Sequence, residues 1–215
     1  MTYVPYDGFL QEVLPQCPGV PELVAINAIR NAAIDFCEQS QWLQYPAAAI
    51  DGVANQAVYA LAVLTDTRVS MITDAWWDTL RLIPKSEDQL AQLFGADWRT
   101  MQGGPNYYLR DTDPTSITVV PYPIISEPGA LTMKTTLCPT RASMTVDPNL
   151  IEYWLEPIAS GAKARLMAMP GQPYFNRTSA LAEALMFRKG VSDAKIQVNR
   201  GLGRAVVNMR PPVFI

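Results

Sequence analysis

Two changes in the spacing of apolar residues constrain how this chain folds more than any other feature of its sequence. Residues 21–43 carry apolar side chains every three or four positions, which is typical of an amphipathic helix. Across residues 45–140 the spacing falls towards two, which is typical of half-buried antiparallel strands. From residue 147 the helical spacing returns. This order predicts an α+β fold, in which helices from both ends of the chain flank a β-rich middle.

The first predicted helix follows the turn-like sequence Cys17-Pro18-Gly19. Pro21 suits its first turn, because proline has no N–H group to leave unpaired there. Charged and amide side chains fall mostly between the apolar positions, so one face of the helix is expected to be buried. The residues of that apolar face are Ile26, Ile29, Ala33, Phe36 and Cys37.

Short segments in the middle of the chain are predicted to form strands. Turn sequences such as Asp51-Gly52 and Pro128-Gly129 separate them. One short helix is expected at residues 86–95, with Ser86 as its N-cap, because a serine oxygen accepts a hydrogen bond from an early backbone N–H. Many short strands of this kind indicate a sandwich or a small barrel. The predicted strands are residues 45–50, 57–61, 67–72, 79–83, 107–110, 116–119 and 131–137.

The next helix is predicted to begin after Asp147, a good N-cap, with Pro148 in its first turn. Pro157 lies inside its pattern and must kink or split the helix, because its ring crowds the preceding turn. The apolar stripe of this helix is Ile151, Leu155, Ile158, Ala162 and Leu166.

A second C-terminal helix is predicted over residues 174–199. Its apolar positions are spaced by four and three residues and are mostly small, which favours close helix–helix packing. Gly190 interrupts this helix and is expected to cost up to ~1 kcal/mol relative to alanine. The seam consists of Ala180, Ala184, Phe187, Val191, Ala194 and Val198.

The last segment, residues 201–215, has no helical spacing. Gly201 and Gly203 release it from the helix, and Pro211-Pro212 favour an extended path. Its apolar end, Val-Phe-Ile, needs a place to be buried, so the segment is predicted to be an arm that binds a partner or a neighbouring subunit. The candidate partner-binding residues are Arg204, Val206, Val207, Met209, Arg210, Val213, Phe214 and Ile215.

These elements together predict four segments. The N-terminal segment with the first helix covers residues 1–44, and a β-rich domain inserted after it covers residues 45–146. Paired helices at 147–200 complete a bundle with the first helix, and the extended arm covers residues 201–215. The fold class is therefore α+β: a helical bundle with an inserted antiparallel sandwich or barrel.

The absence of histidine from the sequence excludes most catalytic classes. Hydrolases with a histidine base and HExxH metalloproteases need that residue. Neither a GxGxxG nor a GxxxxGK[ST] motif occurs, and three separated cysteines indicate neither a zinc site nor a disulfide framework. No apolar run is long enough to span a membrane, and no secretory leader is expected. A structural or binding role without a cofactor is predicted.

A few residues still permit other interpretations. Glu152 and Glu156 lie one helical turn apart and are compatible with a carboxylate-based glycosidase, although a solvated helix face accounts for them better. The adjacent Trp76-Trp77 can stack on bases or sugars, but neighbours in a strand face opposite ways, so one is expected in the core. The aspartates that can act as calcium ligands, although without an EF-hand spacing, are Asp74, Asp78, Asp111 and Asp113.

Charge divides the chain into two parts. Residues 1–159 hold 8 lysines and arginines against 18 aspartates and glutamates, whereas residues 160–215 hold 9 against 2. A chain with an acidic and a basic part can stack on copies of itself, although a basic helix facing solvent accounts for the pattern equally well. Sequence-specific nucleic-acid recognition is disfavoured, since the cations are not interleaved with aromatic residues.

Three groups of residues resemble the tailed-phage head–tail adaptor (connector) proteins. The first is the helix of residues 28–37 followed by Trp42. The resemblance covers roughly residues 20–195. It departs from the family pattern at Pro157, where the family usually has alanine or another helix former. The second and third groups are Trp98, Gly104-Pro105, Tyr107-Tyr108, Asp111, Ile117, Val119, Pro121 and Pro123, and then Leu150, Tyr153, Ile158, Gly161-Ala162, Ala164-Arg165-Leu166, Pro170 and Pro173-Tyr174.

The resemblance implies a virion protein of the head–tail interface, assembled in the host cytoplasm. Such proteins form rings, generally twelve-fold, that dock under the portal protein, bind tail or neck proteins and continue the channel for packaged DNA. Contact with that DNA is expected to be non-specific, and no membrane partner is implied. A tail-completion or neck protein is the alternative within the same class.

Overall fold

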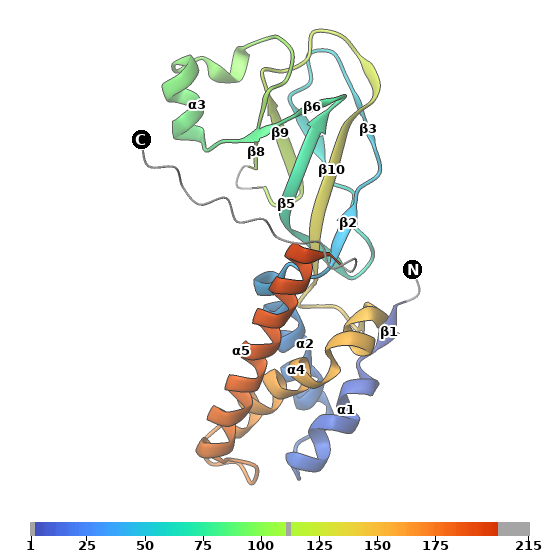
Figure 1. The fold of residues 1–215 in the computed structure, drawn as a ribbon, viewed down its shortest axis with the longest axis vertical. Helices are drawn as coiled ribbons and strands as arrows, with labels where there is room; N and C mark the ends of the chain where they lie inside the picture. Colours follow the sequence, from blue (N-terminus) through green and yellow to red (C-terminus); the bar gives the residue numbers. More distant parts are fainter. Residues whose placement is uncertain (1–2, 111–112, 202–215) are drawn as a thin grey trace. The chain divides into compact units, whose positions relative to one another are not determined.

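The computed structural model describes residues 3–110 and 113–201 of the chain (Figure 1). They form helices and mainly antiparallel sheets, so the predicted α+β class is confirmed. The chain divides into two compact units. We call residues 1–42 with 139–215 the helical unit, and residues 43–138 the β-rich unit.

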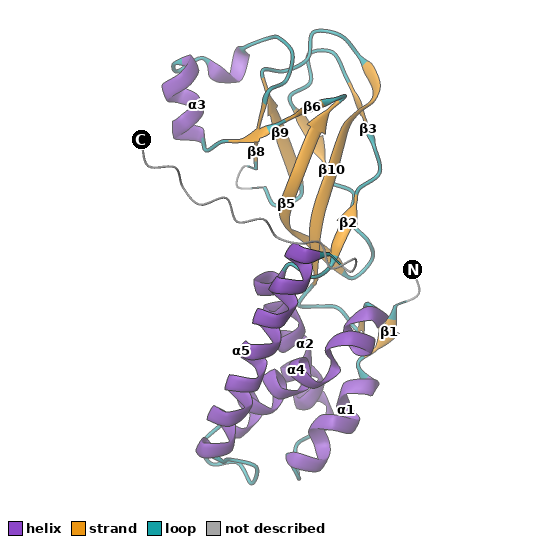
Figure 2. Cartoon of the chain, viewed as in Figure 1, coloured by secondary structure: helices purple, strands orange, loops and turns teal. Residues whose placement is uncertain are grey.

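The helical unit is built around α4, which contacts the other three α-helices of its unit (Figure 2). Two short strands, β1 and β11, pair antiparallel through Val4 and Val146. A single turn of 3-10 helix, η1 (Leu14–Gln16), follows α1. The elements are β1 (Val4–Pro5), α1 (Asp7–Val13), α2 (Glu22–Ser40), β11 (Thr145–Val146), α4 (Pro148–Met167) and α5 (Arg177–Arg200).

Capping residues define the ends of the helices, and one of them acts as the sequence predicts. The Asp147 side chain accepts a hydrogen bond from the Asn149 N–H at 2.9 Å, which confirms Asp147 as the N-cap of α4. The second C-terminal helix begins at Arg177 rather than 174, because the Asn176 side chain accepts from the Ser179 N–H and caps it there. Helix α2 begins at Glu22, so Pro21 is its N-cap and not a first-turn residue as predicted. The helix ends at Ser40, where the following Gln41 adopts a left-handed conformation.

Helix α4 is kinked, as the proline in its interior predicts. Trp154 departs from helical geometry with φ −133° and ψ 24°, three residues before Pro157. Pro157 has no N–H to donate to the preceding turn and its ring crowds that turn. The kink changes which residues face the core: Leu150 and Trp154 are buried, whereas the predicted Ile151 and Leu155 are only half-buried.

Two sheets make up most of the β-rich unit. One has the order β2-β10-β5-β6, with β3 also paired to β10, and the other has the order β4-β9-β8-β7. β10 is antiparallel to β2 and β3, and β9 is antiparallel to β4 and β8, whereas β7 runs parallel to β8. The strands are β2 (Gln44–Pro46), β3 (Ile50–Gly52), β4 (Val58–Ala60), β5 (Thr67–Trp77), β6 (Leu80–Arg81), β7 (Ile83–Pro84), β8 (Tyr107–Leu109), β9 (Ser116–Val120) and β10 (Glu127–Pro139).

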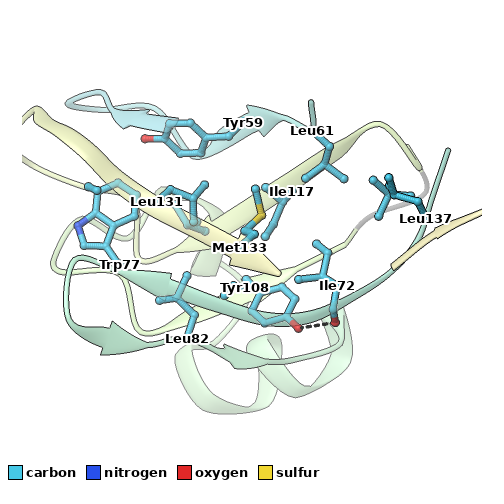
Figure 3. Packing of buried hydrophobic residues seen from close by; sticks show 14 residues of the cluster. Tyr59, Leu61, Ile72, Trp77, Leu82, Tyr108, Ile117, Leu131, Met133 and Leu137 are labelled. Carbon is cyan, nitrogen blue, oxygen red and sulfur yellow. Dashed lines mark hydrogen bonds between the residues drawn. The ribbon is translucent and has the colours of Figure 1, made fainter. Parts of the chain in front are cut away.

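The two sheets share one apolar core. Leu131 and Met133 on β10 meet Ile117 on β9 and Tyr59 on β4 between the sheets (Figure 3). Leu131 and Met133 are alternate positions of their strand, as a two-residue spacing requires. The Tyr59 hydroxyl donates to the Gln56 carbonyl at 3.0 Å, so its polar end is satisfied.

Strand β9 differs from the prediction that it is half-buried, because every one of its residues is buried. Part of the reason lies in helix α3 (Glu87–Phe94) and the 3-10 turn η2 (Trp98–Thr100). Their Leu90 and Trp98 pack in a second apolar cluster with Val120, the last residue of β9. Ser86 is the N-cap of α3, as predicted, and the structure shows that it forms a full capping box with Gln89.

The predicted strand at 79–83 is in fact two short strands. β6 pairs with β5 in one sheet, and β7 pairs with β8 in the other. Between them Leu82 is buried, and its N–H donates to the Ala75 carbonyl at 2.9 Å. The chain therefore changes sheets at Leu82. A similar break divides the predicted segment 45–50 into β2 and β3, both of which pair with β10.

Candidate interaction surfaces

Eight residues between Arg204 and Ile215 were predicted to bind a partner, and all of them lie outside the described residues. The described part of the chain ends at Gly201, directly after α5. The structure therefore leaves the arm as a prediction. Four described regions bear on binding to another protein: a face of α5, an acidic part of α4, a cleft between helices and one edge of the β-rich unit.

Helix α5 exposes large apolar side chains on the face that does not pack on α4. Leu181 and Leu185 are each 63% exposed, and Ile196 is 49% exposed. Arg188 and Lys195 are exposed on the same face, since positions 181, 185, 188, 195 and 196 fall on one side of a 3.6-residue helix. We call these five residues the α5 face. The buried seam predicted from the sequence lies on another side, where Ala180, Val191 and Ala194 are buried.

Helix α4 has an exposed acidic surface before its proline. Glu152 and Glu156 are exposed, and Tyr153 between them is 56% exposed. The Tyr153 ring lies 6.1 Å from that of Trp42, measured between centroids, so it packs beside that ring although more than half of Tyr153 is exposed. We call these three α4 residues the α4 face. The α4 face combines an aromatic ring with two carboxylates, so its charge is opposite to that of the α5 face.

A cleft of about 380 Å³ lies where α1, α4 and α5 meet, and Glu12, Lys163 and Glu183 contribute to its lining. Lys163 is only 7% exposed, and its Nζ lies 3.2 Å from Oε1 of Glu183. A buried ammonium group is tolerated when a carboxylate pairs with it. Burial raises the pKa of the neighbouring Cys17 thiol. Lys163 lies beside the predicted apolar stripe of α4. Its ion pair with Glu183 is sufficient to explain its burial, and no bound ligand is needed.

One edge of β5 is covered by side chains from β8 and the residue after it. The Arg110 guanidinium donates to the carbonyls of Val69 and Ser70, both at 2.7 Å, and the Tyr108 hydroxyl donates to the Ile72 carbonyl at 3.4 Å. Burial lowers the pKa of Arg110 and raises that of Tyr108. An unpaired strand edge is a template for association, and these contacts occupy it.

The described aspartates that were candidates for calcium binding do not form a metal site. Asp74 pairs with Arg81 at 2.5 Å, and hydrogen bonds from Thr115 lower the pKa of Asp113. Asp111 lies outside the described residues. Within residues 3–110 and 113–201, no group of three or more histidine, cysteine, aspartate or glutamate residues is placed to hold a metal ion.

The two adjacent tryptophans divide as the strand geometry predicts. Trp77 is buried in the β-rich core and donates from Nε1 to a Glu127 carboxylate oxygen at 3.0 Å, whereas Trp76 is half-buried. The three cysteines are buried and form no disulfide with one another. Among the described helices, none is long and apolar enough to cross a membrane.

The α5 face is the surface that sequence reasoning missed. Leu181, Leu185 and Ile196 repeat at helical spacing beside the seam, and this second stripe was a visible signal. Two apolar stripes on one helix do not reveal which one packs inward. The contact between Pro157 and Gly190 shows which stripe packs inward, because Gly190 lies on a different side of α5 from the α5 face.

Comparison with known protein families finds a match over most of the chain. Residues 5–210 match the model of the family described as SU10 adaptor protein. The match therefore includes both compact units and extends into the arm. No curated protein matches the chain.

Proposed function

The chain belongs to the SU10 adaptor protein family, and we propose from this that it forms the ring that joins the portal to the tail. The resemblance to head–tail adaptors found in the sequence is confirmed by this match. The chain is thus a phage adaptor, a structural component of the virion. The family match over residues 5–210 is the observation that carries the proposal.

The proposed ring contains copies related by rotation, with twelve as the expected number. A ring requires two different surfaces on each copy, one for each neighbour. The α5 face and the α4 face differ in charge and both expose apolar groups, which supports such a contact. Portal and tail or neck proteins are the proposed partners on the two sides of the ring, and its lumen continues the channel for packaged DNA.

We further propose that the arm, residues 201–215, binds the portal or an adjacent copy. Val213, Phe214 and Ile215 supply apolar groups, and Arg204 and Arg210 supply charge. Burial of each large apolar side chain contributes roughly 1.5–3 kcal/mol before ordering costs. In this proposal the bundle of segments 1–44 and 147–200 and the inserted segment 45–146 form the body of each subunit.

The proposed role is structural, needs no cofactor and includes no catalysis. In this proposal the protein is assembled into the particle in the host cytoplasm. In the finished virion it lies at the head–tail interface. For the alternative of a glycosidase, Glu152→Gln and Glu156→Gln are decisive. Loss of a measurable lytic activity in these variants, with particles otherwise intact, would support the enzyme.

Electron microscopy of virions labelled with an antibody to this protein tests the proposed position. We expect the label at the head–tail junction, and a ring in class averages of that region. Label lower on the tail would support a tail-completion or neck protein instead. A two-fold dimer in the virion would contradict the ring.

A further inference from the structure

The α5 face is apolar at its centre and cationic beside it. Leu181, Leu185 and Ile196 are about half to two-thirds exposed, and Arg188 and Lys195 lie among them. Helix α5 has 24 residues and is therefore about 36 Å long, so this face is a long stripe. Adjacent exposed aliphatic side chains on one face are costly in water and are a mark of an interaction site.

The α4 face of the same chain has the complementary chemistry. Tyr153 supplies an amphipathic ring, a residue type enriched at the centre of interfaces. Glu152 and Glu156 stand on either side of it in sequence and are exposed. Two carboxylates beside an aromatic group complement two cations beside aliphatic groups, and such complementarity favours the correct partner over others.

We propose that the α5 face of one copy docks on the α4 face of a second copy of this chain. The proposal rests on the proposed ring and names the surfaces that join its subunits. The charge pattern favours a second copy as the occupant, since both halves of the contact occur on one chain. Two α5 faces placed against each other would bring cations together, which costs free energy. The contact therefore uses different surfaces, and each copy keeps one free face for the next.

Cysteine crosslinking of the full chain tests this contact. Three double variants each carry Tyr153→Cys together with Leu181→Cys, Leu185→Cys or Ile196→Cys. The native Cys17, Cys37 and Cys138 are buried, so the introduced thiols are the accessible ones. After mild oxidation we expect at least one double variant to give a ladder of covalent trimers and larger species. A ladder requires two different cysteines per copy.

Two controls test whether the crosslinks arise from this contact. The single variant Leu185→Cys should remain monomeric, and a covalent dimer would instead indicate a two-fold α5–α5 contact and overturn the proposal. The double variant Leu23→Cys/Tyr153→Cys replaces the comparably exposed Leu23 of α2 and measures random collision. Ladders from all three tested pairs that are no stronger than this control would also overturn it.

Charge reversal provides a second test, which probes the electrostatic part of the contact. Variant A carries Arg188→Glu/Lys195→Glu, and variant B carries Glu152→Lys/Glu156→Lys. In the crosslinking pair that gives the ladder, each swap alone should abolish it, whereas an equal mixture of A and B should restore it with alternating copies. A third version, Glu22→Lys/Asp193→Lys, has the same charge change as B at exposed helix positions outside both faces and should keep the ladder.

The outcome also separates this inference from the proposed function. A ring seen at the head–tail junction without a ladder in any pair means that the ring exists but uses other surfaces. A ladder without label at the junction means that the contact exists but the protein is not the portal adaptor. Variant B that keeps its full ladder, with A also unaffected, overturns the charge pairing.

Discussion

At Gly190, helix α5 passes so close to Pro157 of α4 that no side chain fits between them. A Cβ atom at this position would lie 2.4 Å from Cβ and 2.6 Å from Cγ of Pro157. Gly161 has the same role against the ring of Phe187, where a Cβ would lie 2.6 Å away. The glycine that the sequence presents as a local cost to the helix is therefore needed for packing. The sign of its effect is opposite to the sequence-based expectation.

We expect Gly190→Ala to lower the free energy of unfolding by about 1–3 kcal/mol, as overpacking does in a rigid contact. The proline ring cannot move aside as a flexible side chain would, so the gain in helix propensity of up to ~1 kcal/mol does not compensate. Denaturant titration followed by circular dichroism measures the change. Ser192→Ala on the same helix is the control and should be near neutral. Greater stability of Gly190→Ala would show that the two helices separate easily.

Three buried acidic protons predict a loss of stability at alkaline pH. Burial raises the pKa values of Cys17, Tyr59 and Tyr108 in the folded protein. A raised pKa means that the folded state holds its proton more tightly than the unfolded state, so stability is complete below the unfolded pKa and falls as pH rises. Denaturant titrations at pH 8 and 10.5 should show a lower unfolding free energy at the higher pH. The loss should be smaller in Tyr108→Phe, and an equal loss would contradict the assignment.

At the scale of the elements, side chains supply hydrogen bonds to β5 that the short strand β8 does not supply from its backbone. β8 has only three residues, yet Tyr108 on it and Arg110 just after it reach the carbonyls of three residues of β5. Arg110 also donates to the Pro114 carbonyl at 2.9 Å and so holds the following loop. Each carbonyl of the β5 edge that loses its donor would face a desolvation cost. This network therefore fixes how the two sheets of the β-rich unit meet.

Arg110→Met should destabilise the protein by about 1–3 kcal/mol, because buried acceptors lose charged donors while the apolar stem is kept. Arg81→Met is the matched control, since Arg81 makes an exposed ion pair with Asp74 and such pairs contribute about 0–1 kcal/mol. Melting temperatures of the two variants give the comparison. Equal small shifts would mean that water replaces the guanidinium at the β5 edge.

At the scale of the whole molecule, charge separates along the chain and again on the surface of the helical unit. The acidic residues Glu12, Glu22, Glu152 and Glu156 come from α1, α2 and the first half of α4. The exposed cations of the C-terminal part lie mainly on α5. Polarity of this kind suits copies that meet through unlike surfaces, which is the arrangement that a closed ring requires.

Deletion of residues 204–215 tests the arm. If the arm binds a partner, the truncated protein should fold with a near-normal melting temperature and fail to join phage heads, because only the intermolecular contact is lost. Thermal unfolding and sedimentation with purified heads measure the two properties. A truncated chain that unfolds would instead place the arm in the core of its own subunit.

Binding to DNA should be weak and independent of sequence, because packaged DNA of every sequence must pass the proposed channel. Phosphate contacts release counterions, so the observed affinity should fall steeply between about 50 and 200 mM salt, on the order of tenfold or more for even a few contacts. Gel-shift titrations with two unrelated duplexes measure this. Sequence-selective binding that survives high salt would contradict the channel.

Local features were readable from the sequence wherever neighbours along the chain decide them. The caps at Ser86 and Asp147, the kink caused by Pro157 and the burial of one of the two adjacent tryptophans all depend on residues within one or two turns or on strand alternation. The short helix α1 at Asp7–Val13 escaped prediction because its apolar positions cover too few turns to show a period.

Contacts between residues distant in sequence decided the rest. Burial of Val120 at the end of β9 depends on α3 and η2, the change of sheets at Leu82 depends on the edge of β5, and the requirement for Gly190 depends on Pro157. The exposed stripe on α5 became a candidate interface only when α4 was seen to take the other stripe. Apolar spacing shows which side chains favour burial. Only the packed structure determines which neighbour buries them and which face remains exposed for a partner.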